Sequence, residues 1–225
     1  MVKAYRSVKY TNIIKNVLCQ KVNFDNVTKK PHIYLYAGDL PLSPHYKKFI
    51  GLSVTKHDSR HIKHDITQKH KLPDNSVDIY QAEDVLEHIP YELLEDTVND
   101  IYRILKPGGV FRLSVPDYGC DILHERARKN ASGEIVFDPE GGGRFVDGKV
   151  VDGGHLWFPR FKTVADLLKS TKFNNIIFYH YYDEDGKAVT LPIDYSIAYV
   201  QRTPDNDERV KKPYRPMSIV VDCIK

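Results

Sequence analysis

Residues 72–117 read LPDNSVDIYQAEDVLEHIPYELLEDTVNDIYRILKPGGVFRLSVPD, and this stretch decides the fold. It predicts a strand at Val77–Gln81, an acidic loop, a helix at Tyr91–Leu105 and a second strand at Val110–Val115. Apolar residues of the helix recur every three or four positions and so share one face. Pro107-Gly108-Gly109 ends the helix and turns the chain. A strand, a helix and a second strand in this order predict a right-handed parallel crossover, which is half of a doubly wound α/β sheet.

Further runs of β-forming residues extend this sheet on both sides. The predicted helix that follows the central stretch covers Phe161–Ser170. The remaining predicted strands lie within Pro31–Asp39, Phe49–Val54, His64–Ile66, Asn175–Tyr182 and Ser218–Ile224, with a further strand or hairpin arm at Ile193–Arg202. Strands that alternate with helices and then close with a β pair favour a mixed α/β sheet with helices on both faces.

The chain divides into an arm and one domain. We predict that residues 1–30 form an N-terminal arm or linker, with a short helix near Thr11–Gln20, and that residues 31–225 form the domain. Glycines interrupt short strand-like pieces throughout residues 118–156. This segment is too long for a plain loop in a compact domain, so we expect a lid or a substrate-binding insertion there.

Composition predicts a soluble globular protein. Hydrophobic residues make up 41% of the 225 residues and charged residues 28%, with a net charge of +3. That charge is too small to indicate nucleic acid as a partner. The three cysteines form no CxxC pair, which favours reduced thiols in the cytoplasm. No segment approaches the ~20 apolar residues of a membrane span, and the oligomeric state stays open.

Several motifs closely resemble those of class I S-adenosylmethionine (SAM)-dependent methyltransferases. They are Leu72–Asp78 (LPDNSVD), Val85–Ile89 (VLEHI), Arg103–Gly109 (RILKPGG), Ser114–Asp117 (SVPD) and His155–Phe173 (HLWFPRFKTVADLLKSTKF). The sequence is most similar to type 11-like methyltransferases and to enzymes that methylate sugar or glycan hydroxyls. The resemblance implies a Rossmann-like fold with a mostly parallel seven-stranded sheet and an antiparallel C-terminal strand. It also implies SAM as the cofactor and a small-molecule or glycan acceptor.

The sequence departs from the family at the cofactor loop, where only Gly38 remains of a glycine-rich turn. Glycine matters there because the backbone approaches the cofactor closely. The acid that binds the ribose is also displaced: Ser53–Thr55 occupy its usual place, and Asp58 follows. Asp65 fits the position that caps the adenine amino group. The cofactor residues that the resemblance implies are Tyr36, Ala37, Gly38, Asp39, Asp58, Asp65, Ile66, Gln81, Ala82 and Glu83.

Transfer to a hydroxyl requires a base, because the acceptor loses a proton as it attacks the methyl group. We expect His155 or Asp117 to serve, since His155 ends the glycine-rich segment and Asp117 follows the fifth strand. A structural histidine that bonds to the backbone is the competing interpretation of His155. The expected acceptor residues are Asp84, Tyr118, His124 and Trp157. For Glu87 and His88 we expect helix capping and packing.

His57, His61 and His64 invite a metal site, but the segment reads as a loop without a clear fourth ligand, so we predict no metal there. Whether a divalent ion binds near Asp117 and Asp121 stays open. Two alternative functions remain beside a sugar or glycan O-methyltransferase. A degenerate methyltransferase fold that serves as a binding or scaffold module would explain the altered cofactor loop. An RNA or protein methyltransferase is the second alternative. The motif [N/D]-P-P-[Y/F], which serves methylation of nucleobase amino groups, does not follow the fourth strand.

Overall fold

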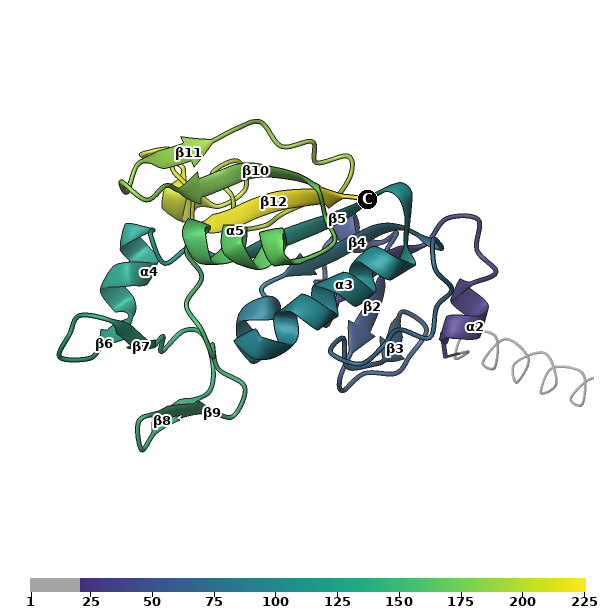
Figure 1. Ribbon diagram of the computed structural model, residues 1–225, viewed down its shortest axis with the longest axis horizontal. Helices are drawn as coiled ribbons and strands as arrows, with labels where there is room; N and C mark the ends of the chain where they lie inside the picture. Colours follow the sequence, from purple (N-terminus) through teal and green to yellow (C-terminus); the bar gives the residue numbers. More distant parts are fainter. Residues whose placement is uncertain (1–20) are drawn as a thin grey trace, which may run out of the picture.

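The computed structural model describes residues 21–225, and the helix expected near Thr11–Gln20 lies outside this range. One eight-stranded sheet forms the centre of the molecule, in the order β3-β2-β1-β4-β5-β12-β10-β11 (Figure 1). Its strands are β1 Tyr34–Ala37, β2 Ile50–Ser53, β3 His61–Lys63, β4 Val77–Glu83, β5 Leu105–Pro116, β10 Asn175–Tyr182, β11 Ala188–Thr190 and β12 Ser218–Ile224. The pairs among β1 to β5 are parallel, whereas β12 runs antiparallel to both β5 and β10. The mostly parallel sheet with an antiparallel C-terminal strand is therefore confirmed.

Three details differ from the expected strands. The sheet has an eighth strand, β11, which pairs with the end of β10. The third strand covers His61–Lys63 rather than His64–Ile66, because the chain leaves the sheet after the His64 amide bonds to the Ser53 carbonyl. Residues 193–202 contain no strand, and the same segment covers one face of the sheet instead.

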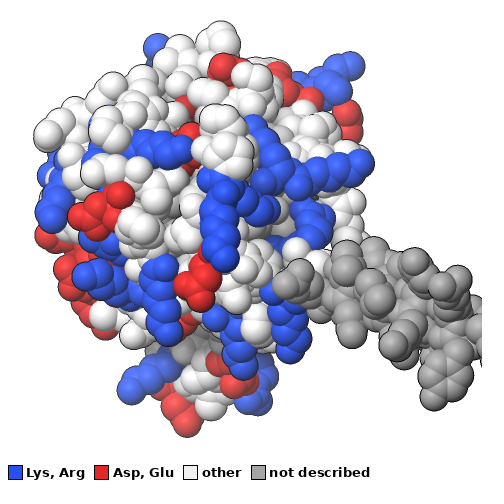
Figure 2. Space-filling model, turned by 90° about the vertical axis from the view of Figure 1, so that its right-hand side faces the viewer, with Lys and Arg blue, Asp and Glu red and all other residues white. Residues whose placement is uncertain are grey.

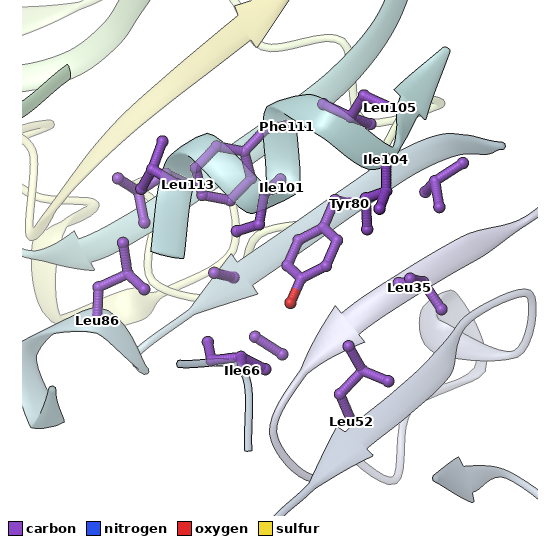
Figure 3. Close-up of a cluster of buried hydrophobic side chains, with 14 of the residues drawn as sticks. Leu35, Leu52, Ile66, Tyr80, Leu86, Ile101, Ile104, Leu105, Phe111 and Leu113 are labelled. Carbon is purple, nitrogen blue, oxygen red and sulfur yellow. The ribbon is translucent and has the colours of Figure 1, made fainter. Parts of the chain in front are cut away.

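The helices α2 Phe24–Val27, α3 Leu94–Ile104 and α5 Phe161–Ser170 pack against one core cluster. Figure 3 shows the middle of this cluster, where Ile101 and Ile104 of α3 lie against Tyr80 and Phe111 of the sheet. The Tyr80 hydroxyl keeps a hydrogen-bond partner in the core, because it lies 3.1 Å from His70 Nε2. Burial of such side chains contributes about 1.5–3 kcal/mol each, so the packing of α3 stabilises β4 and β5.

Among residues 21–225, no long helix covers the opposite face, contrary to the expectation of helices on both faces. The 3-10 turn η1 Pro44–Tyr46 and residues 193–200 pack there on Tyr36 and Phe49. Arg112, fully buried on this face, forms two 2.7 Å hydrogen bonds with Asp222. It also donates to the carbonyl oxygens of Asp194 and Ala198. These side-chain bonds satisfy backbone groups that a helix or strand would otherwise pair.

The insertion extends from the end of β5 and contains a short helix and two small β ribbons (Figure 1). Its elements are α4 Asp121–Arg126, β6 Arg128–Lys129, β7 Ile135–Phe137, β8 Arg144–Val146 and β9 Lys149–Val151. The buried carboxylate of Asp138 ties the ribbons to α4 through an ion pair with Arg126 at 2.7 Å. The insertion is therefore structured rather than an open loop.

Packing at the amino end of the domain begins before residue 31. Val22, Phe24 and Val27 are buried in the main core cluster. Figure 2 views the molecule from the side on which α2 lies in Figure 1, and Lys and Arg are spread over this face among acidic side chains. Several basic groups at the amino ends of the strands are paired, as Lys106 is with Asp78 at 2.7 Å. Within residues 21–225, no helix is both long and apolar enough to cross a membrane.

Candidate active site

A cavity of about 490 Å³ opens at the carboxyl ends of β1, β2 and β4. It lies where β1 and β4 are neighbours and their outgoing connections diverge, which is where open α/β sheets bind ligands. Its lining residues are Gly38, Asp39, Leu52, Ser53, Val54, Thr55, His64, Asp65, Ile66, Thr67, Asp84, Val85, His88, Ile89, Pro90 and Leu93. Four of the ten expected cofactor residues are among them: Gly38, Asp39, Asp65 and Ile66.

Gly38 forms the turn that follows β1. Its φ of +86° lies in the left-handed region, which glycine adopts without strain. Its amide donates to the Leu52 carbonyl at 2.8 Å, which fixes the turn against β2. A Cβ at this position would lie 3.4 Å from Val85 Cγ2 across the cavity. The one glycine that the sequence keeps is therefore at the position where the backbone needs it.

A histidine supports the rest of this loop. His61 Nε2 accepts a hydrogen bond from the Leu40 amide at 3.1 Å, and His61 Nδ1 lies 2.9 Å from Asp58 Oδ1. Asp58 also accepts hydrogen bonds from the amides of Arg60 and His61. Because Asp58 is outside the cavity and committed to these contacts, its expected role in ribose binding is not supported. The imidazole needs Gly51 beneath it, since a Cβ there would lie 2.5 Å from His61 Cδ2.

Ser53 ends β2 where the family resemblance places an acid. Its hydroxyl accepts hydrogen bonds from the amides of Thr55 and Lys56, so it caps the strand end. The nearby carboxylate comes instead from the loop after β1, where Asp39 forms an ion pair with Lys56 at 2.8 Å. Partial burial opposes the ionisation of Asp39, but hydrogen bonds from Lys56 and Ser53 outweigh it and lower its pKa. An ionised carboxylate is therefore available at this edge of the cavity.

Asp65 and Ile66 lie on the cavity wall that follows β3. One carboxylate oxygen of Asp65 accepts hydrogen bonds from the amide and the hydroxyl of Thr67, which holds the side chain in place. Ile66 is buried beside it and offers an apolar surface. His64 lines the same wall, and burial lowers its pKa to about 4, so it is neutral at pH 7. A fixed carboxylate next to apolar side chains suits a flat ring with an exocyclic amino group.

The other expected cofactor residues lie away from the cavity. Side chains alternate along a strand, and both sides of this sheet are covered. Ala37 and Ala82 face the helix-covered core. Tyr36 packs on the opposite face. Gln81 and Glu83 turn to that face as well: Gln81 donates to the Tyr199 carbonyl, and Glu83 accepts from the Tyr46 hydroxyl at 2.6 Å. Burial raises the pKa of Glu83 to about 7, although the Tyr46 hydrogen bond opposes the shift.

Asp84 joins this cavity to a second one. It has a φ of +56°, and it lines both the first cavity and an adjoining one of about 610 Å³. Its carboxylate forms an ion pair with Arg202. The second cavity is lined by Pro41, Leu42, Ser43, Asp84, Tyr199, Gln201, Arg202, Asn206, Asp207, Glu208 and Arg209. The sequence motifs do not mark these residues of the 199–209 segment, because it follows no periodic pattern.

The two expected bases lie apart. Asp117 lines a separate hollow of about 340 Å³ and accepts hydrogen bonds from the amides of Gly119 and Tyr182. Burial raises its pKa to about 6. His155 is buried behind His88, with the two ring centroids 4.8 Å apart. Burial lowers the pKa of His155 to about 4. Neither residue lines the first or the second cavity.

Of the four expected acceptor residues, only Asp84 lines a cavity next to the cofactor site. Tyr118 is fully buried, and its hydroxyl lies 2.6 Å from both Asp138 Oδ2 and His155 Nδ1. His124 lies on α4, in the insertion. The Trp157 indole donates to the Leu86 carbonyl at 2.9 Å and so supports the loop after β4. The expected acceptor roles of Tyr118, His124 and Trp157 are therefore not supported by position.

Comparison with known proteins agrees with the fold. Residues 42–113 match the methyltransferase domain family. A SAM-dependent methyltransferase from Archaeoglobus fulgidus is similar in structure, with a TM-score of 0.51, 15% identity and 90% coverage of both chains. A second, from Clostridium acetobutylicum, has a TM-score of 0.52 and 12% identity, and the match covers 100% of this chain and 99% of that one. No curated protein matches the sequence. The sheet order and these two structures show that the chain has the fold of SAM-dependent methyltransferases, and the match to the methyltransferase domain family covers residues 42–113.

Proposed function

We propose that the protein transfers the methyl group of SAM to a hydroxyl of a sugar or glycan. The observation that carries the proposal is the pair of cavities that meet at Asp84. One cavity lies where class I methyltransferases bind their cofactor, and the other is lined mainly by polar side chains. The methyl group would pass from SAM in the first cavity to the acceptor in the second beside Asp84, which lines both.

The first cavity fits the three parts of SAM. Asp65 and Ile66 suit the adenine ring, as a carboxylate acceptor beside an apolar wall. Asp39 would accept the ribose hydroxyls from the loop after β1, in place of the acid that usually ends the second strand. The methionine part would lie beside the turn at Gly38, next to Asp84 and Val85. SAM has no phosphate, so one glycine is enough where the backbone approaches the ligand.

The second cavity fits a hydroxyl-rich acceptor. Gln201, Asn206 and Asp207 provide amide and carboxylate groups, which hydrogen-bond well to sugar hydroxyls. Tyr199 adds an aromatic ring, and its partner His45 stacks on it with 4.0 Å between ring centroids. An amine substrate needs no base, because it only has to be neutral when it attacks the methyl group. A hydroxyl substrate must lose its proton, and this cavity has a carboxylate, Asp84, where it meets the cofactor cavity.

Asp84 is the better candidate for the base than His155 or Asp117. In the transfer, an acceptor oxygen forms a bond to the methyl carbon while the bond from that carbon to the sulfonium sulfur breaks. The hydroxyl proton must leave the acceptor, and the Asp84 carboxylate is the group that lines both cavities. Burial raises the pKa of Asp84, although Arg202 opposes the shift. A carboxylate with a raised pKa is a better proton acceptor.

Two measurements test the proposal. Calorimetric titration with SAM and with S-adenosylhomocysteine should show one site per chain, and Asp39→Asn should weaken both ligands about tenfold. Transfer of a labelled methyl group to free sugars, glycosides, nucleosides and peptides should favour the first two. Absence of binding at millimolar ligand would support a degenerate binding module instead. Binding together with transfer to nucleosides or peptides would indicate an RNA or protein methyltransferase.

A further inference from the structure

Three potential metal ligands meet behind the cofactor cavity. Glu87 and His88 belong to the turn η2 Leu86–His88, and His155 ends the insertion. One ligand atom from each lies within 4.8 Å of those from the other two. The proposed methyl transfer uses none of the three. Two imidazoles and one carboxylate from two segments form a compact donor set. The contacts of each side chain decide what this cluster can hold.

Glu87 has a buried carboxylate without a partner. The residue is fully buried, and neither carboxylate oxygen has a hydrogen bond. The closest basic atom is His155 Nε2, at 3.7 Å from Oε1, which is too long for a hydrogen bond. A buried carboxylate costs free energy unless it is paired or coordinates a metal. The position therefore requires either a proton or a cation.

In both imidazoles the Nδ1 atom already has a hydrogen-bond partner, so Nε2 is the nitrogen left for an ion. His88 Nδ1 lies 2.8 Å from the Gly153 carbonyl oxygen, which can only accept, so Nδ1 carries the proton. Tyr118 donates its hydroxyl proton to Asp138, so the Nδ1 of His155 must be the donor in its 2.6 Å contact with Tyr118. The Nε2 atom of each ring then carries a lone pair. Histidines that bind metals are oriented in this way by a second hydrogen bond.

We propose that Glu87, His88 and His155 bind one divalent transition-metal ion of the Zn²⁺ or Mn²⁺ type. Imidazole nitrogens favour such ions, whereas Mg²⁺ and Ca²⁺ prefer oxygen donors. Ligands at ~2.1 Å from an ion lie about 3–3.5 Å from each other in tetrahedral or octahedral geometry. The longest separation in the cluster, 4.8 Å, must therefore shorten by about 1.3–1.8 Å. His88 is only half-buried and stands at the cavity edge, so its ring has room to move.

The site would act on the acceptor. His88 lines the cofactor cavity, as does Asp84, so an ion held by His88 would lie near the carboxylate proposed as the base. A bound ion lowers the pKa of a coordinated hydroxyl and orients it. The proton would pass from the coordinated hydroxyl to Asp84, and no redox change is involved. This role depends on the proposed function, whereas the binding of the ion does not.

The experiment uses the full chain without an affinity tag, after dialysis against EDTA. Zn²⁺ binding is measured by calorimetry, and Co²⁺ binding by its visible absorption. We expect one ion per chain, and Glu87→Gln and His88→Gln should each weaken Zn²⁺ binding at least tenfold. Glu92→Gln and His57→Gln replace exposed residues of the same types and should bind as the wild type does. Circular dichroism verifies that each variant is folded.

Equal Zn²⁺ affinity in the wild type and in both folded ligand variants would overturn the proposal, as would absence of binding. Loss of binding in His57→Gln would place the ion in the His57–His64 segment and would also overturn it. SAM titration of the EDTA-treated protein tests the proposed function separately, since the cofactor residues Asp39 and Asp65 do not belong to the cluster. A protein that binds Zn²⁺ but not SAM would keep the metal site and reject the transferase.

Discussion

His61 Nε2 accepts a hydrogen bond from the backbone amide of Leu40 at 3.1 Å, and so a residue of β3 fixes the loop after β1. A glycine-rich turn holds its shape through its own backbone, whereas this loop is held by a side chain from two strands away. The altered cofactor loop is therefore compatible with a defined cavity, because an imidazole replaces part of what additional glycines provide.

Replacement of His61 by Ala should lower the stability of the protein and weaken SAM binding. The Leu40 amide loses its buried acceptor, which costs about 1–3 kcal/mol. Urea unfolding measures the stability, and titration with S-adenosylhomocysteine measures the affinity, which should fall about tenfold. His57→Ala replaces an exposed histidine and serves as the control. Unchanged affinity in a destabilised His61→Ala would show that the loop keeps its shape unaided.

Asp58→Asn distinguishes support of His61 from direct contact with the cofactor. Because Asp58 lies outside the cavity, the asparagine oxygen can still accept from the Arg60 and His61 amides, and SAM affinity should change less than threefold. Asp39→Asn should reduce it about tenfold under the same conditions, since Asp39 lines the cavity. A larger loss in Asp58→Asn than in Asp39→Asn would assign the ribose to Asp58 after all.

Arg112→Met should be strongly destabilising. Asp222 would then stay buried without its cation, and loss of one partner of a buried pair costs about 3–5 kcal/mol. The carbonyl oxygens of Asp194 and Ala198 would lose their donor as well. Arg144→Met removes one partner of an exposed pair and should cost under about 1 kcal/mol. Urea unfolding of both variants measures the difference, and similar values for the two would contradict the argument.

Glu83→Gln should change how stability depends on pH. Burial raises the pKa of Glu83 from 4.5 to about 7. The native state thus binds the proton more tightly than the unfolded state, and stability falls as pH rises from 4.5 to 7. The shift corresponds to about 3 kcal/mol. Relative to the wild type, Glu83→Gln should gain roughly that amount between pH 4.5 and 7.5. Parallel curves for the two proteins in urea unfolding would exclude a titrating Glu83.

The sequence predicts the regular elements with strong periodicity. The bounds of α5, β10 and β12 agree with the predicted ones, because apolar spacing and flanking turn residues mark both ends. The segment 193–202 was wrongly predicted as a strand or hairpin arm. Its apolar residues do face the sheet, but Lys48 and Arg112 side chains, rather than a neighbouring strand, satisfy several of its carbonyl groups.

The sequence predicts the site residues that lie in the loops after the strands, but not those that lie within the strands. Gly38, Asp39 and Asp65 follow strand ends and lie in the cavity. Tyr36 and Gln81 lie within strands whose two faces are both covered, so residue type does not reveal which face a side chain occupies. The second cavity forms because residues 199–209 pack near the end of β4. That contact joins segments far apart in the sequence, so local sequence patterns do not predict it.

Three hydrogen bonds join the end of the insertion to the turn after β4. The Gly153 carbonyl accepts from His88, the Leu156 amide donates to the Glu87 carbonyl, and the Trp157 indole donates to that of Leu86. A chimaera that exchanges residues 118–152 with those of a relative would keep these contacts, whereas an exchange through residue 157 would remove them together. For anyone who redesigns the acceptor range, the usable splice point therefore lies before Gly153.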